Sequence, residues 1–142
     1  MVRNNIKIGF IGVGYMGYGM ALNILKRKYN LNIIAHTNRK SINKLVKLGA
    51  MELKTYKNFA INSNVIIICV TNTIIAKKVI NNLKSFLIKG TLIIDVSCDE
   101  GMGFYFAQPT TFKKPLLEIG DIDYYAVDHT PSYFWESASR SI

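Results

Sequence analysis

Three glycines near the N-terminus have the spacing of a phosphate-binding turn. Gly12, Gly14 and Gly17 form the pattern G-x-G-x-x-G, with Tyr15 and Met16 before the last of them. In such a turn the first glycine permits a tight bend, the second lets the backbone approach a pyrophosphate, and the third lets helix and strand pack closely. Free N–H groups at the start of the following helix would bind the phosphates. The pattern predicts a dinucleotide-binding site, and the alternative is a purely structural glycine turn.

The residues further along the chain indicate which dinucleotide is bound. In NAD sites an acid about 20 residues past the glycines usually binds the ribose hydroxyls. Here that place is taken by Thr37, Asn38 and Arg39. A guanidinium with hydroxyl and amide neighbours suits a 2′-phosphate, and the absence of an acid removes a repulsion. We therefore expect NADP(H) rather than NAD(H). The alternative is that Arg39 and Lys40 only begin a solvated helix.

Apolar runs and amphipathic segments alternate along the chain and predict the elements that position these residues. We expect strands at residues 6–12, 31–36, 50–53, 64–70, 91–96 and 123–128. We expect helices at residues 16–28, 39–48, 56–61 and 74–87, and the start of another near residue 131. Strands with few polar positions, separated by amphipathic helices, indicate a parallel sheet covered on both faces. The predicted fold class is α/β, a doubly wound parallel sheet of the Rossmann type in a single domain, residues 1–142.

Charge is distributed unevenly along the 142 residues. Residues 1–94 carry 15 Lys and Arg against one acid, Glu52, whereas residues 95–142 carry 3 against 8 acids, and the whole chain has a formal charge of +9. The lysines are scattered over helical segments and are not interleaved with aromatic residues. We therefore favour a solvated basic face over a nucleic-acid-binding surface.

Hydropathy and cysteine spacing bear on the location of the protein. No run approaches the roughly 18 apolar residues of a membrane-spanning helix, and the first residues lead directly into a strand instead of a signal peptide. We expect a cytoplasmic protein. Cys69 and Cys98 have neither metal-ligand spacing nor a secreted context, so we expect two free thiols and no metal site.

The first two thirds of the chain, residues 6–97, resemble a known superfamily. The segments IGFIGVGYMGYGMALNILK, TNRKSINKLVKLGA, NVIIICVTNTIIAKKVI and KGTLIIDVS are similar to the NADP-binding domain of the β-hydroxyacid dehydrogenase and 6-phosphogluconate dehydrogenase superfamily. The resemblance implies residues that bind the 2′-phosphate, residues at the nicotinamide side, and a residue that helps to hold the substrate. The residues implied to bind the 2′-phosphate are Asn38 and Arg39, and those at the nicotinamide side are Val70 and Thr71. The residue implied to help hold the substrate is Ser97, whose loop we expect to face the nicotinamide.

From about residue 88 the chain resembles a different superfamily. The segments DEGMGF, PTTF and YYAVDHTPS are similar to alanine dehydrogenases and pyridine nucleotide transhydrogenases, and most of all to carboxyethylornithine synthases. Those enzymes use NADPH to join pyruvate to a side-chain amine of ornithine. The resemblance changes near Asp95, at the end of a strand that both superfamilies share. It implies a place near the reacting carbon for Asp99 and a place beside the nicotinamide ribose for His129.

Asp99 and His129 are therefore the candidate catalytic residues. A carboxylate at position 99 could orient or protonate an imine nitrogen while hydride arrives from the cofactor. The alternatives are structural, because loop Asp and His side chains usually serve turns. In that case Asp99 caps backbone N–H groups of its loop and His129 braces Asp128.

The relatives of both parts of the chain need a further domain to form a complete active site. We expect this chain to be the cofactor half of an imine or ketone reductase that acts on a small carboxylate and an amine, with a second domain or chain completing the site. Two alternatives stay open at this point. One is an NADP(H)-binding module without catalysis, and the other is a basic nucleic-acid-binding protein.

Overall fold

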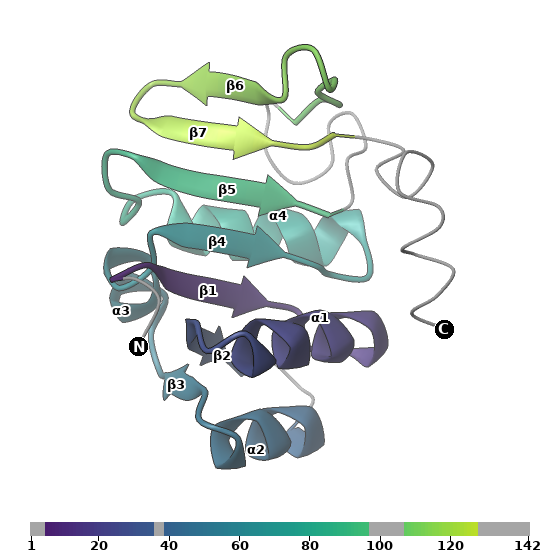
Figure 1. Ribbon diagram of the computed structural model, residues 1–142. Coiled ribbons are helices and arrows are strands. Elements are labelled where there is room, and N and C mark those ends of the chain that lie inside the picture. Colours follow the sequence, from purple (N-terminus) through teal and green to yellow (C-terminus); the bar gives the residue numbers. More distant parts are fainter. Residues whose placement is uncertain (1–4, 36–38, 97–106, 128–142) are drawn as a thin grey trace.

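The computed structural model of the chain describes residues 5–35, 39–96 and 107–127. Seven strands in these ranges form one sheet in the order β3-β2-β1-β4-β5-β7-β6 (Figure 1). The strands are β1 Lys7–Ile11, β2 Asn30–Ile34, β3 Met51–Leu53, β4 Val65–Ile68, β5 Thr91–Asp95, β6 Leu116–Ile119 and β7 Ile122–Tyr125. The helices are α1 Tyr15–Lys26, α2 Arg39–Lys47, α3 Tyr56–Ile61 and α4 Thr73–Leu83.

The sheet confirms the predicted fold class, with one addition at its edge. Every neighbouring pair from β3 to β7 is parallel, but β6 runs antiparallel to β7. Strand β6 corrects the predicted elements, which include no strand at residues 116–119. Ile119 pairs with Ile122, so Gly120 and Asp121 form a two-residue hairpin turn in which Gly120 has a φ of +60°. Gly-Asp between two apolar runs is a recognised hairpin signal, and it was present in the sequence.

Local sequence signals explain where the helices begin and end. The side chains of Thr55 and Asn72 accept hydrogen bonds from the first turns of α3 and α4, as helix caps do. Gly49, with a φ of +106°, follows the end of α2 and suits a residue just past a helix end. Helix α4 ends at Leu83, four residues before the predicted end. None of the helices in the described parts of the chain is long and apolar enough to cross a membrane.

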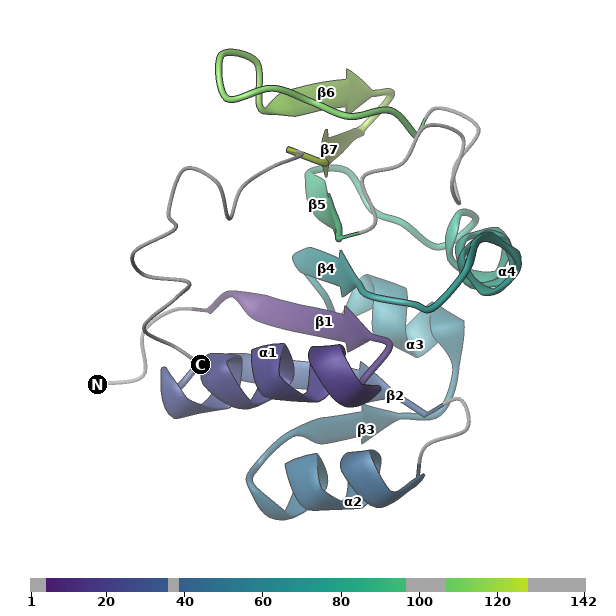
Figure 2. The same cartoon turned by 90° about the vertical axis from the view of Figure 1, so that its right-hand side faces the viewer.

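Helices cover both faces of the sheet. Figure 2 shows α1 and α2 on one side and α3 and α4 on the other. Neighbouring residues of a strand point to opposite faces, so Phe10 packs in the core beneath α1 and α2, and Ile11 packs in the core beneath α3 and α4. On β2, Ile33 packs in the core beneath α1 and α2, and Ile34 packs in the core beneath α3 and α4.

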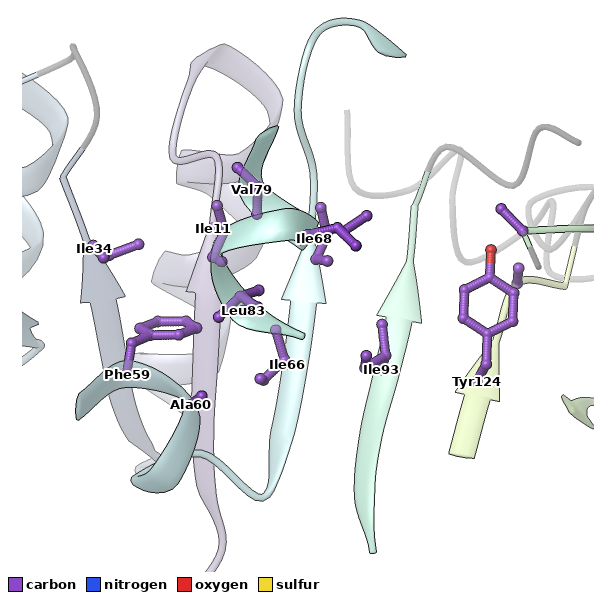
Figure 3. Packing of buried hydrophobic residues seen from close by; sticks show 13 residues of the cluster. Ile11, Ile34, Phe59, Ala60, Ile66, Ile68, Val79, Leu83, Ile93 and Tyr124 are labelled. Carbon is purple, nitrogen blue, oxygen red and sulfur yellow. The ribbon is translucent and has the colours of Figure 1, made fainter. Parts of the chain in front are cut away.

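The core beneath α3 and α4 extends across the place where the sequence resemblance changes. Figure 3 shows Ile66 of β4, Ile93 of β5 and Tyr124 of β7 side by side in this core. Each of these three side chains is completely buried. The segment after Asp95 therefore adds strand β7 to the same sheet and the same core as the first part of the chain.

Candidate functional site

A pocket lies where the order of the strands reverses. From β1 the chain continues to β2 on one side, and after β3 it crosses to β4 on the other side of β1. Ligands of open α/β sheets bind at the carboxyl ends of the strands at such a point. The pocket there has a volume of about 130 Å³, below the roughly 300 Å³ of sites that enclose a small ligand. A dinucleotide would therefore lie along the edge of the sheet. The pocket is lined by Ile11, Gly12, Val13, Gly14, Ile34, Ile42, Tyr56, Cys69, Val70, Thr71, Ile75 and Val79.

The three glycines of the turn have different surroundings. Gly12 has a φ of +97°, and a Cβ atom there would overlap the carbonyl group of Cys69. A Cβ atom on Gly17 would overlap the carbonyl group of Gly12, so this glycine permits the close contact of α1 with the turn. Around Gly14, in contrast, nothing lies within 4 Å of a Cβ position. The space in front of Gly14 is the space that a bound phosphate would need.

The start of α1 offers unoccupied donors. No side chain caps the helix at Gly14, and its first turn contains no acid. The side chains of Tyr15 and Met16 are exposed and leave the first turn open to solvent. The N–H groups of this turn and the positive end of the helix dipole are therefore available to an anion.

The end of β4 forms the other wall of the pocket. The backbone N–H of Cys69 donates to the carbonyl oxygen of Ile11 at 2.9 Å, which joins the ends of β4 and β1. Cys69 is a free thiol, as predicted, and burial raises its pKa. Val70 is half-buried in the pocket wall, while Thr71 is exposed at its rim.

Arg39, the candidate ligand of a 2′-phosphate, is the first residue of α2 and pairs with Glu52 of β3. Its Nη1 donates to Oε1 at 2.6 Å and its Nη2 to Oε2 at 3.2 Å. This bidentate arrangement holds the two groups in a defined orientation. The hydrogen bond from Arg39, together with that from Lys54, lowers the pKa of Glu52 to about 2. The same pairing raises the pKa of Arg39.

No local sequence signal indicates the pairing of Arg39 with Glu52. Glu52 is the single acid of residues 1–94, and 13 positions separate it from Arg39. Arg39 lies on α2 and Glu52 on β3, so their contact depends on how α2 packs beside β3. The side chain of Arg39 is nevertheless 53% exposed, so the guanidinium can still contact a ligand. The helix predicted at residues 39–48 is present as α2, Arg39–Lys47.

Several predicted site residues lie outside the described parts of the chain. They are Thr37, Asn38, Ser97, Asp99 and His129, and Cys98, which is predicted to be a free thiol, also lies there. Their assigned roles remain predictions. Within the described ranges, no three His, Cys, Asp or Glu side chains gather as a ligand set for a metal ion.

The sequence of residues 7–100 matches the family described as the NAD binding domain of 6-phosphogluconate dehydrogenase. The chain belongs to this family. The match confirms the resemblance seen in the first part of the chain, and it includes the glycine turn, Arg39 and the end of β4. The residues that line the pocket at the strand reversal all fall within the matched range.

Some known proteins are similar to this NAD-binding domain in sequence, and others in fold. The 2-hydroxy-3-oxopropionate reductase of Escherichia coli K12 is 32% identical over 95 residues, which are 65% of this chain and 32% of that protein. A reductive aminase from Aspergillus terreus, solved with NADPH4, cyclohexanone and allyl amine, is 22% identical with a TM-score of 0.55. That likeness covers 66% of this chain and 32% of the aminase, and it concerns the fold.

A solved L-alanine dehydrogenase shares the fold over more of the chain. The TM-score is 0.70 at 18% identity, over 96% of this chain and 40% of the dehydrogenase. This likeness reaches beyond residue 100, where the family match ends. The predicted resemblance to alanine dehydrogenases therefore holds at the level of the fold. The chain spans between 32% and 40% of the length of these three proteins.

Proposed function

We propose that the chain is the NADP(H)-binding domain of an oxidoreductase that reduces an imine or a ketone of a small carboxylic acid. The observation that carries the proposal is the open space in front of Gly14, between the uncapped start of α1 and the end of β4. A pyrophosphate is the group that such a turn accommodates.

The preference for NADP(H) rests on Arg39. Its guanidinium is charged and half exposed, and it lies at the start of α2, where a 2′-phosphate of the adenosine ribose would be bound. Glu52 places a carboxylate beside Arg39, so the sequence argument that no acid lies near this place does not hold. We still expect NADPH to bind more tightly than NADH, because Glu52 holds the guanidinium in place and is itself only 13% exposed.

The reaction that we propose is of the carboxyethylornithine synthase type, in which an amine and pyruvate are joined by reduction. NADPH, when bound, supplies a hydride to the carbon of the substrate. Asp99 would orient the nitrogen or supply a proton to it, and Ser97 would help to hold the substrate. The solved reductive aminase was crystallised with a ketone and an amine, which supports this class of substrate. A second domain or chain would complete the site, because the chain spans about a third of its relatives.

Fluorescence titration of the purified chain with NADPH and with NADH tests the cofactor proposal. Saturable NADPH binding that is about tenfold or more tighter than NADH binding supports it, since Arg39 contributes charge-assisted hydrogen bonds to the phosphate only. Equal binding of NADPH and NADH contradicts the preference, and binding of neither contradicts the proposal as a whole.

A parallel titration with duplex and single-stranded nucleic acid at two salt concentrations tests the alternative of a basic nucleic-acid-binding protein. If no salt-sensitive binding appears, this alternative is excluded.

NADPH oxidation with pyruvate plus ornithine tests the reaction. Turnover by the chain, lost in Asp99→Asn while NADPH binding is retained, supports a catalytic role for Asp99. NADPH binding without turnover, with every pairing of small oxo acid and amine, is expected of the second candidate, an NADP(H)-binding module without catalysis, and also of a cofactor half without its completing domain or chain. The match of residues 7–100 to an NAD-binding domain is the observation that favours this candidate.

A further inference from the structure

Lys54 and Arg39 contact the same carboxylate oxygen. Lys54 Nζ lies 3.0 Å from Oε1 of Glu52, and Arg39 Nη1 lies 2.6 Å from that atom. The two cations come from different elements, because Arg39 begins α2 and Lys54 follows β3. Glu52 carries one negative charge and its two partners carry two positive charges. The cluster therefore has an excess of one positive charge.

Exposure within the cluster is unequal. The side chains of Lys54 and Arg39 are 74% and 53% exposed, whereas that of Glu52 is only 13% exposed. A ligand that approaches from solvent would meet the two cations before it met the carboxylate. A phosphate monoester, with a charge between −1 and −2 near neutral pH, would balance the excess charge. The arrangement thus favours an anion, although it contains an acid.

The cluster adjoins, by strand register and along the chain, residues that line the pocket we assign to the nucleotide. Lys54 follows Leu53, which pairs in register with Ile34 of the pocket wall. Tyr56, two residues beyond Lys54, is also part of that wall. Both cations are therefore next to the carboxyl ends of β2 and β3, where the adenosine end of a dinucleotide would lie.

We propose that Lys54 is a second ligand of the cofactor's 2′-phosphate, and that Glu52 holds Lys54 and Arg39 together when the phosphate is absent. This assignment rests on the proposed NADP(H) preference and adds a residue that determines specificity. On binding, the phosphate oxygens accept hydrogen bonds from both cations, which remain charged. A lysine that served only an exposed ion pair would not distinguish NADPH from NADH.

Titration of four proteins with NADPH and NADH tests the assignment. They are the wild type, Arg39→Ala, Lys54→Ala and the control Lys89→Ala. Lys89 is also exposed and also pairs with a carboxylate, Asp121 at 3.3 Å, but it precedes β5 and lies away from the carboxyl ends of the strands. We expect Lys54→Ala to weaken NADPH binding by about five- to tenfold, with NADH binding changed less than about twofold. Lys89→Ala should change neither NADPH binding nor NADH binding.

Two further measurements make the result specific. Lys54→Arg keeps a cation at this place and should retain most of the NADPH preference. Adenosine 2′,5′-bisphosphate should compete with NADPH more strongly than ADP in the wild type, and this difference should shrink in Lys54→Ala. Circular dichroism melts establish that each variant is folded.

The outcomes separate this inference from the proposed function. If the wild type prefers NADPH but Lys54→Ala weakens NADPH and NADH equally, or weakens neither, the role of Lys54 is wrong while the cofactor assignment stands. If the wild type shows no preference for NADPH, the proposed selectivity fails and the assignment of Lys54 fails with it.

Discussion

The hydroxyl group of Tyr124 donates a 2.8 Å hydrogen bond to Oδ2 of Asp95, and both side chains are buried. Asp95 is the last residue of β5 and Tyr124 lies on the neighbouring strand β7. The two residues come from the two sides of the position where the sequence resemblance changes. The hydrogen bond therefore joins both parts of the chain at the edge of the sheet that holds the pocket.

Tyr124→Phe is expected to lower the free energy of unfolding by about 1–3 kcal/mol, because a buried carboxyl group loses a hydrogen-bond donor. Urea unfolding measures the change. We propose that the chain is one domain, so wild type and variant should each unfold in a single transition. The matched control is Tyr125→Phe, at the half-buried neighbour whose side chain points to the other face of the sheet. Two separate transitions would contradict the single domain, and equal stability of Tyr124→Phe and wild type would contradict a role for the hydrogen bond.

Alanine at two glycines of the turn should affect different properties, stability in one case and NADPH binding in the other. Gly12→Ala should destabilise the protein by at least about 1–3 kcal/mol, because it adds backbone strain at a positive φ and an overlap with the carbonyl group of Cys69. Gly14→Ala should remain folded, since its Cβ enters open space at a φ of −71°. It should weaken NADPH binding by about tenfold or more, because the methyl group occupies the place of the pyrophosphate. Thermal melts and NADPH titrations distinguish the two effects. Unchanged NADPH binding in Gly14→Ala would argue against this position of the phosphates.

The Cys69 thiol should report on the occupancy of the pocket. Burial raises its pKa above the ordinary value of 9.0, so little thiolate exists at neutral pH and alkylation by iodoacetamide should still accelerate beyond pH 9. In a Cys98→Ser background, saturating NADPH should slow the alkylation of Cys69, because the thiol lines the pocket. Mass spectrometry of time points gives the rate. Alkylation of Cys69 at the same rate with and without bound NADPH would place the cofactor elsewhere.

The contribution of Glu52 to stability should depend on pH. Its pKa is lowered from 4.5 to about 2 in the folded chain, so the ionised form is favoured by folding. The stabilisation is therefore complete above about pH 4.5 and is lost as the pH falls toward 2. The difference in urea midpoint between wild type and Glu52→Gln should be largest near pH 7 and shrink across this window. A difference that stays constant down to pH 2.5 would show that the ion pairs of Glu52 do not contribute.

Much of the fold could be predicted from the sequence because its signals are local. The spacing of Gly12, Gly14 and Gly17 specified the turn between β1 and α1, and the period of apolar residues specified the helices and most of the strands. Gly49 marked the end of α2. Strand β6 was missed although its Gly120-Asp121 turn was visible, because its alternating exposed and half-buried residues lack a strong apolar run.

The side-chain contacts of the site and of the sheet edge beside it could not be predicted from local sequence signals. Arg39 and Glu52 are 13 residues apart, Tyr124 and Asp95 are 29 apart, and no local period links the members of either pair. Tyr124 and Asp95 meet because parallel pairing brings β5 next to β7, and Arg39 and Glu52 meet because α2 packs beside β3. By itself, the sequence determined the elements and the phosphate-binding turn, since these depend on residues within a few positions of one another. Which side chains face each other at the carboxyl ends of the strands was decided only by the tertiary structure, because that depends on the order and register of the strands.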